Sequence, residues 1–438
     1  QEKAKKSQEA RSKAQTAVGD SLSCWKEVVT SLEKSTEYWK KASEAQTALV
    51  EGYSLAATES EEAAEYSKKA FEAHREAMVK DKNWREGNRW KEAGKSAQYS
   101  ADCRIQGVEV QRLGKEANAQ EYAAAAEKLQ QATTSFTQAV QLLLEDKEKE
   151  NGILWSQGNA LQSEGMSKKY RLQGVKAQET GKTILAAACR EAATTSQLAA
   201  DQWQLAAQTH AAEKENEGIS WGNEGESLQS KADYCAKAAE AQEAGKITLA
   251  AAYREVAATS QRAAEQCKLS AQTKAAGKES EGISWGNEGE SLQSKADYCV
   301  KAAEAQEAGK TQLAAGYQET AEISQLAADQ WKLSAETIAL GKKREGLSWG
   351  WQGKSLQSKA DYCAKAAEAQ ESGKTTLAAA CREAAAMSQL AADQYKQSAQ
   401  ACAAGNSSED TRLFNEAKAM QVEADAIAAR AKGSIISD

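Results

Sequence analysis

Residue types that could support catalysis are few, and they do not form a recurring site. The tripeptide Gly-Lys-Thr occurs three times, first at residues 181–183, and matches the end of a phosphate-binding loop. That loop also requires a glycine five residues earlier and a preceding strand, whereas all three copies carry lysine or glutamate at that position. We therefore interpret each glycine as a helix terminus and expect no nucleotide site.

Acid–base and metal chemistry is also poorly supported. Histidine occurs only at positions 74 and 210, which are not equivalent in the repeat described below, so we do not expect a hydrolytic triad or a histidine metal site built on the repeat. Glu224, Glu226 and Asp233 lie among lysines and glutamines, a pattern typical of a solvated or interface face. We expect a protein that is not an enzyme and has no catalytic residue, cofactor or metal site.

The nine cysteines are too sparse for a disulfide scaffold, and no Cys-x-x-Cys pair occurs. Cys235, Cys299 and Cys363 share one position of the repeat, and Cys381 lies at another. Cys363 lies ten residues before Gly373 and Cys381 eight residues after it, so an antiparallel hairpin would make a disulfide between them conceivable. Because the two central copies hold tyrosine at the Cys381 position, we favour small buried thiols.

Tryptophans recur every 64 to 66 residues, at Trp25, Trp90, Trp155, Trp221, Trp285 and Trp349. Phe414 falls where a seventh would be. We predict that each tryptophan packs at the start of a helix, over nearby glycines such as Gly225, because glycine lets a ring or a neighbouring backbone come close. Docking of these side chains against a neighbouring molecule is the alternative.

An internal repeat determines the architecture. Residues 217–245 return 64 residues later with one substitution, Ala236 to Val300, and a period of this length indicates a helical repeat. Glycine is the usual left-handed residue just past a helix end, so two glycines per repeat predict two helices, at 219–244 and 246–276 in this copy. In the first copy the corresponding glycine comes late, at Gly52. The predicted turn glycines are Gly114, Gly181, Gly245, Gly277, Gly309, Gly341, Gly373 and Gly405.

Composition and periodicity agree on the fold class. The 438 residues include 90 alanines and no proline, which favours helices without hinges. Positions such as Gly225, Leu228 and Ala232 follow a 4-3 spacing and are mostly small, so a single hairpin buries little and must stack on its neighbours. We predict an all-α fold, an elongated solenoid-like array of about six antiparallel helical hairpins of 64–66 residues with Ala- and Gly-rich seams.

The array has predicted boundaries that leave an incomplete hairpin at each end. A frayed tail is expected at residues 433–438. The segments are a partial N-terminal capping helix at 1–21, repeats at 22–86, 87–151, 152–216, 217–280, 281–344 and 345–408, and a C-terminal capping helix and tail at 409–438.

The net charge and the first residue of the chain suggest which partners the protein binds and where in or outside the cell it is located. The 56 basic and 63 acidic residues give a net charge of −7, evenly spread along the chain, which argues against a nucleic-acid partner. The apolar runs are too short to span a membrane. The chain begins with Gln1 rather than methionine, as after removal of a leader, and Asn406 begins an N-glycosylation sequon. We expect a secreted or cell-surface protein, with a cytoplasmic one as the alternative.

Two functions remain open. Near-identical repeats without a singular chemical site favour a structural protein that assembles with copies of itself into a filament, sheath or surface layer. The alternative is a scaffold that binds a peptide or protein partner on its concave face. In that case the partner would be recognised by side chains that vary at one position of the second helix, namely Trp203, Cys267, Trp331 and Tyr395.

Overall fold

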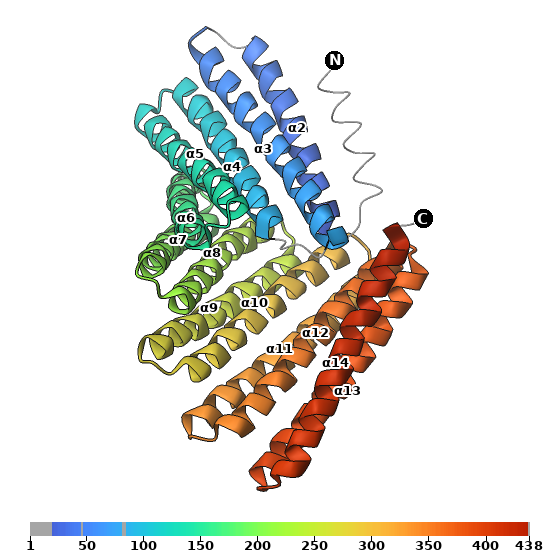
Figure 1. The fold of residues 1–438 in the computed structure, drawn as a ribbon. Helices are drawn as coiled ribbons and strands as arrows, with labels where there is room; N and C mark the ends of the chain where they lie inside the picture. Colours follow the sequence, from blue (N-terminus) through green and yellow to red (C-terminus); the bar gives the residue numbers. More distant parts are fainter. Residues whose placement is uncertain (1–19, 45–46, 81–84, 437–438) are drawn as a thin grey trace. The chain divides into compact units, whose positions relative to one another are not determined.

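The computed structural model describes the backbone of residues 20–44, 47–80 and 85–436, which form thirteen helices and no strand (Figure 1). They group into two compact units, Gln1–Glu215 and Asn216–Asp438. Within each unit a helix packs mainly against the helices next to it in sequence. The prediction of an all-α, solenoid-like array of helical hairpins is therefore confirmed.

Unit 1 contains helices of unequal length, from 25 to 34 residues. They are α2 (Asp20–Glu44), α3 (Thr47–Lys80), α4 (Arg85–Arg112), α5 (Glu116–Leu144), α6 (Glu148–Glu179) and α7 (Thr183–Ala211). The even-numbered α4 also contacts α2 and α6. Odd- and even-numbered helices therefore form two layers within this unit.

Unit 2 is far more regular. Its helices are α8 (Glu215–Glu243), α9 (Ile247–Ala275), α10 (Glu279–Glu307), α11 (Thr311–Ala339), α12 (Lys343–Glu371), α13 (Thr375–Ala403) and α14 (Ser407–Ile436). The first six each have 29 residues, or about eight turns, and three residues separate each from the next. Two such helices with their turns account for the period of 64 residues.

All eight predicted turn glycines have positive φ, between 71° and 81°. At Gly245 the backbone N–H of Lys246 donates to the Ala241 carbonyl at 2.9 Å, and that of Gly245 donates to Gln242 at 3.0 Å, the pattern of a Schellman helix end. Two turns adopt the same geometry without glycine, at Asp146 (φ 56°) and Glu213 (φ 63°). The predicted helices 219–244 and 246–276 agree with α8 and α9 except at α8's first turn.

Two local predictions are wrong. Gly52 is not at a turn but inside α3, where an added Cβ would lie 2.3 Å from Val108 Cγ2, so this glycine permits the close approach of α3 and α4. The tail is not frayed from Gly433 onward, because α14 continues through Ile436. Residues 437–438 and most of the predicted N-terminal capping helix, 1–19, lie outside the described residues.

The core of each unit is built largely from alanine, as expected for seams of small residues. An interior helix such as α10 uses two sides at once: Gly289 faces Cys267 of α9, and Ser284 hydrogen-bonds Ser334 of α11 at 2.9 Å. Along the described residues, no helix is long and apolar enough to cross a lipid bilayer.

Candidate functional site

The variable position of the second helix is a packing position. On α9 and α11, Cys267 and Trp331 lie against glycines of the following helix, where an added Cβ at Gly289 would meet Cys267 Sγ at 2.6 Å and one at Gly353 would meet Trp331 at 3.0 Å. Tyr395 is fully buried. Cys267 and Trp331 thus fill glycine notches in the helix seams, and Tyr395 packs against Trp351 and Phe414, so the variation at this position follows from packing. The sequence signal for this packing is the set of glycines in the following helix, Gly289 for Cys267 and Gly353 for Trp331.

The repeated tryptophans Trp90 and Trp155 of unit 1 lie near the starts of α4 and α6 and contact other aromatic rings. Trp90 stacks on Tyr66 with 5.7 Å between ring centroids, and Lys69 Nζ lies 4.8 Å from the Trp90 ring. Trp155 packs against the fully buried Phe136 at 5.1 Å. The side chain of Trp25 lies outside the described residues.

In unit 2, Trp221, Trp285 and Trp349 are all half-buried. The indole N–H of Trp221 donates to Glu217 at 3.5 Å, whereas the buried indole nitrogen of Trp285 has no hydrogen-bond partner. Half-burial suits both helix anchoring and docking, so both remain predictions. Gly225, beside Trp221, is buried as expected for a close helix contact.

The cysteines are small packing groups. Cys235, Cys299 and Cys363 are half-buried and Cys381 is buried. Cys363 packs with Ile323 and its neighbours, whereas Cys381 belongs to a different cluster around Leu377. Both are thiols in this structure, and a disulfide between them stays a prediction. Burial raises the pKa of the Cys363 thiol to about 11, so at neutral pH it is protonated.

Serine pairs bridge the helices of each unit 2 hairpin. They are Ser220–Ser270 at 2.9 Å, Ser284–Ser334 at 2.9 Å and Ser348–Ser398 at 3.1 Å. Ser270 Oγ also lies 2.7 Å from the carbonyl oxygen of Gly282, so one hydroxyl contacts both neighbouring helices. Because equivalent hydroxyls occupy each hairpin, the same polar contact recurs every 64 residues.

Two glutamate carboxyl groups are buried on helices α8 and α10, which carry serines of these pairs. Glu224 and Glu288 are each 5% exposed, and in both the Oε2 atom has no hydrogen-bond partner. Burial raises the pKa of each carboxyl to about 7. This burial contradicts a solvated face for Glu224 but not the predicted interface face, since the side chain lies near Lys268 of α9. Glu226 is exposed as expected.

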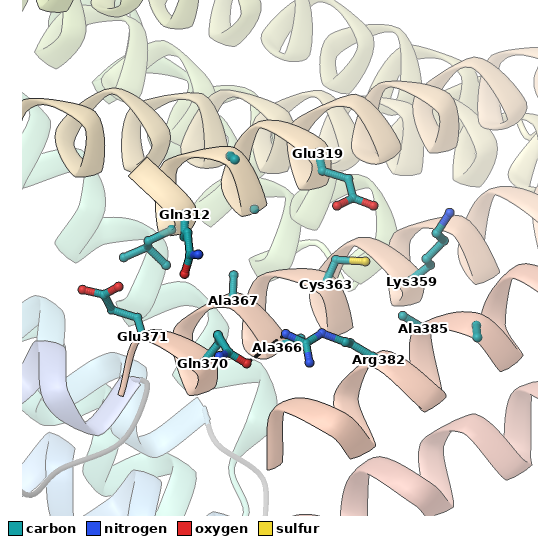
Figure 2. Close-up of a pocket in the computed structure, with 14 residues that line it drawn as sticks. Gln312, Glu319, Lys359, Cys363, Ala366, Ala367, Gln370, Glu371, Arg382 and Ala385 are labelled. Atoms are coloured by element: carbon teal, nitrogen blue, oxygen red, sulfur yellow. Dashed lines mark hydrogen bonds between the residues drawn. The ribbon is translucent and has the colours of Figure 1, made fainter. Parts of the chain in front are cut away.

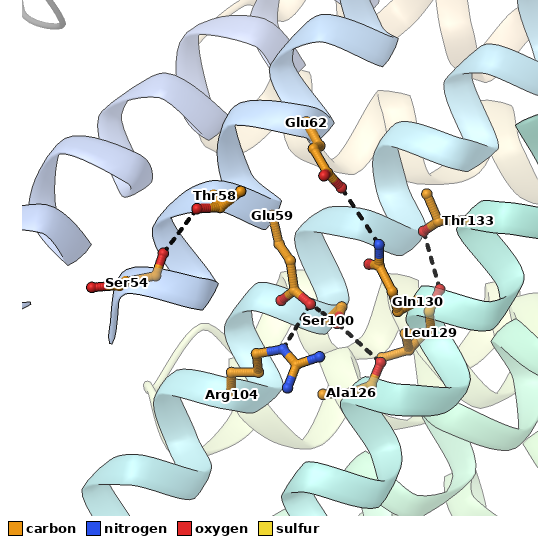
Figure 3. Close-up of polar contacts among 10 residues, drawn as sticks. All are labelled: Ser54, Thr58, Glu59, Glu62, Ser100, Arg104, Ala126, Leu129, Gln130 and Thr133. Carbon is orange, nitrogen blue, oxygen red and sulfur yellow. Dashed lines mark hydrogen bonds and ion pairs between the residues drawn. The ribbon is translucent and has the colours of Figure 1, made fainter. Parts of the chain in front are cut away.

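In unit 1 a buried glutamate has a cationic partner. Glu59 on α3, 3% exposed, accepts hydrogen bonds from Arg104 Nε at 2.6 Å and Ser100 Oγ at 3.0 Å, both on α4 (Figure 3). Ser100 Oγ also lies 2.9 Å from the Ala126 carbonyl oxygen of α5. Burial raises the pKa of Glu59, while the guanidinium of Arg104 opposes the shift. The cluster ties three helices together through one charge pair.

A groove of about 660 Å³ lies over α12, between α11 and α13 (Figure 2). Small side chains form it: Cys363, Ala366 and Ala367 on α12, with Gly316 on α11 and Ala385 on α13. A smaller groove of about 230 Å³ occupies the equivalent place over α4, between α3 and α5. The same place in the repeat is therefore hollowed in these two hairpins.

Three polar groups at the rim of the larger groove have partners within the protein. Arg382 Nη2 donates to Gln370 Oε1 at 3.0 Å (Figure 2), and Lys359 Nζ donates to Gln389 Oε1 at 2.9 Å. Glu371 forms an ion pair with a lysine of α11's leading turn at 3.1 Å. What the groove offers a ligand is therefore mainly its small apolar floor.

Exposed apolar side chains recur at one repeat position of unit 2. Ile219, Ile283 and Leu347 are 44%, 44% and 42% exposed and lie near the starts of α8, α10 and α12. A second position gives Leu326 and Leu390 on α11 and α13, both 51% exposed. Because stacked hairpins place equivalent residues side by side, each position forms a row on the surface.

The last helix has a different outer face. Ser348 and Gln352 of α12 are buried at 1% and 8% exposure, and Ser348 contacts α13. Counting from the turn glycine, the same positions of α14 hold Arg412 and Glu416, which form an exposed ion pair at 2.6 Å. Charged side chains on α14 thus stand at positions that form a seam on α12, a pattern typical of a capping repeat.

The sequon asparagine has a structural role of its own. Asn406 is exposed in the turn before α14, and its Oδ1 accepts a hydrogen bond from the backbone N–H of Glu409 at 3.2 Å. That is the geometry of a helix N-cap. Glycosylation at Asn406 stays a prediction.

Across the described residues, no group of three or more His, Cys, Asp or Glu side chains is arranged to hold a metal ion. His74 on α3 lies 3.2 Å from the Asn88 side chain, and His210 is on α7, where burial lowers its pKa. The predicted site residues are thus seam and surface residues of a repeat. No protein-family model matches the chain, and none of the curated proteins compared with it is similar.

Proposed function

We propose that this chain is a non-enzymatic structural protein that assembles with copies of itself, side by side, into a sheath, filament or surface layer. The observation that carries the proposal is the row formed by Ile219, Ile283 and Leu347 on unit 2. A helical-repeat architecture suits a structural or scaffold role. A location outside the cell or at its surface belongs to the same proposal.

A second copy is the partner that fits this row best. Its own row has the same side chains at the same spacing, so two rows can pair along their whole length. An unrelated partner would need apolar groups that match the distance between successive hairpins. The match follows from repetition alone, because each hairpin presents the same face.

The expected strength points to cooperative assembly. Burying the exposed part of one such side chain contributes about 1 kcal/mol, so six of them contribute on the order of 6 kcal/mol. Association itself costs roughly 4 to 15 kcal/mol, so a single pair of rows gives a weak dimer. The second row, at Leu326 and Leu390, gives each molecule a further surface, and a molecule held at both rows is retained much longer.

Growth sideways is favoured over growth beyond the C-terminal end. The outer side of α14 carries the ion pair of Arg412 and Glu416 where interior helices carry a seam. Stacking another hairpin there would bury charged groups and cost their desolvation. We therefore expect this end of the array to stay free.

The test compares the chain with two triple variants by sedimentation velocity and electron microscopy over a wide concentration range. The row variant carries Ile219→Ser, Ile283→Ser and Leu347→Ser, and we expect its association to need at least tenfold higher concentration. The control removes more exposed apolar area, at unrelated positions, with Leu113→Ser, Leu144→Ser and Val422→Ser. Monomers of the unmodified chain at every concentration, or equal loss in both variants, would contradict the proposal.

The alternative function is a scaffold that binds a peptide or protein partner on its concave face, and the groove over α12 favours it (Figure 2). An apolar helix could lie on its floor of small side chains. Replacing Ala367 by glutamate would then abolish capture of the partner while leaving self-association unchanged. The two functions are separated by which substitution has an effect, the one in the groove or those in the row.

A further inference from the structure

We propose that unit 2 contains a pH response that is independent of self-association: the buried carboxyl groups of Glu224 and Glu288 must be neutral for helices α8–α11 to pack tightly, so these hairpins open more readily as the pH rises through neutrality.

The geometry of the two side chains is the first support. Each is 5% exposed and has an Oε2 atom without a hydrogen-bond partner. Each directly precedes a buried seam glycine, Gly225 or Gly289. A neutral carboxyl is tolerated in such a place, whereas an ionised one without a partner loses its hydration and gains little in return.

The charges around the two carboxyl groups do not compensate for that loss. Facing Glu224 from α9 are Lys268, which is exposed, and the thiol of Cys267. The charged groups facing Glu288 are Arg262 from α9 and Lys332, Asp329 and Glu336 from α11. Because the lysines remain in water, burial dominates and raises the pKa of both carboxyl groups to about 7.

The chain contains its own comparison at this position. The next hairpin holds Gln352, 8% exposed, a neutral amide of the same shape. On α14, where the position is exposed, Glu416 forms an ion pair with Arg412 at 2.6 Å. The position therefore holds a permanently neutral group in one buried copy and a paired charge in the uncovered copy.

The direction of the pH effect follows from the raised pKa. Below about pH 4.5, the ordinary pKa of glutamate, the carboxyl is protonated both in the folded and in the opened state, so ionisation imposes no penalty. As the pH rises from there through 7, the opened state loses its proton first and is favoured. Between pH 5 and pH 8 each carboxyl shifts the opening equilibrium by on the order of fiftyfold.

The experiment is hydrogen exchange of the full-length chain at pH 5, 6.5 and 8, at a concentration where it is monomeric, with rates corrected for intrinsic chemistry. We expect opening of α8–α11 to increase at least tenfold from pH 5 to pH 8. The double variant Glu224→Gln and Glu288→Gln should remove most of that increase. Glu290 and Asp361 also have a raised pKa through burial, but they remain in the variant, so the difference isolates the two glutamates.

Two further variants keep the proposal falsifiable. Glu416→Gln makes the same change at the exposed position and should leave the profile of α8–α11 unchanged. Gln352→Glu adds a third buried carboxyl and should extend the pH response to α12 and α13. An opening equilibrium of α8–α11 that is flat from pH 5 to pH 8, or a full response in the double variant, would overturn the proposal. Histidine titration does not interfere, because both histidines, His74 and His210, lie in unit 1.

Discussion

Units 1 and 2 each consist of stacked helical hairpins, but different interactions hold the hairpins together. In unit 1 the helices differ in length, and buried polar groups have individual partners, such as Glu59 with Arg104 and Arg89 with Asn151 at 2.5 Å. In unit 2 the interior helices are equal, and the same serine pair recurs in each hairpin. The comparison shows that a seam of small residues can be completed by polar pairs that occur once, as in unit 1 and at Arg344–Asp410 of unit 2, or by one contact used repeatedly.

The two solutions respond differently to change. A unique pair holds one place in the array, so its loss is local and large. A repeated contact contributes little to the free energy of unfolding at each place. A glycine or serine substitution at one such contact therefore shows what the equivalent contacts contribute in the other hairpins of unit 2. Three predictions separate these cases.

The largest effect is expected in unit 1. Arg104→Ala leaves Glu59, 3% exposed, without its cation, and a buried charge that loses its partner costs about 3 kcal/mol. The free energy of unfolding, measured by urea denaturation at pH 7, should fall by this amount. Adding Glu59→Gln to the variant should restore part of the loss, since the amide needs no counter-charge; a double variant no more stable than Arg104→Ala would rule out the charge explanation.

A smaller loss is expected at a glycine seam of unit 2. In Gly289→Ala the new Cβ would lie 2.6 Å from Cys267 Sγ and 3.0 Å from the Ala263 carbonyl oxygen, and such overpacking costs about 2 kcal/mol. Gly152→Ala in α6 is the matched control, because its nearest contact would be His210 at 3.6 Å. Thermal unfolding should show a stabilisation of about 0.5–1 kcal/mol for the control; the same sign in both variants would refute the packing argument.

The smallest effect is expected at the serine pairs. Ser270→Ala removes the hydroxyl that contacts Ser220 at 2.9 Å and the Gly282 carbonyl oxygen at 2.7 Å, at a cost of about 1 kcal/mol. Ser334→Ala should cost a similar amount, because it occupies the same position one hairpin later. Both are measured by urea denaturation, and a difference above about 1 kcal/mol between them would show that the repeats are not energetically equivalent.

The sequence predicts the helices well because their ends depend on local chemistry. A glycine that adopts positive φ ends a helix wherever it stands, and Gly245 or Gly373 can be recognised without knowledge of the rest of the fold. Gly52 shows the limit of that rule. A glycine also occurs where another helix comes close, and Val108, the residue that requires it, is far away in sequence.

The candidate site was harder to predict, because burial depends on how many neighbours a helix has. Glu224 lies among polar residues in the sequence and resembles a surface residue, but its side chain is buried near α9. Trp331 is of a residue type that is common at binding sites, but its ring fills the space beside Gly350 and Gly353. Pairwise geometry of this kind becomes visible only once neighbouring hairpins are placed together.

Equal helices have a consequence for how the chain can change in length. Because each interior helix of unit 2 has 29 residues, about eight full turns, every hairpin begins with its residues at the same angle around the axis. Gain or loss of 64 residues by recombination between the near-identical copies would therefore leave all surviving seams in register. The protein can therefore become longer or shorter by whole hairpins. Each such change alters the length of the array and leaves the fold of the remaining hairpins unchanged.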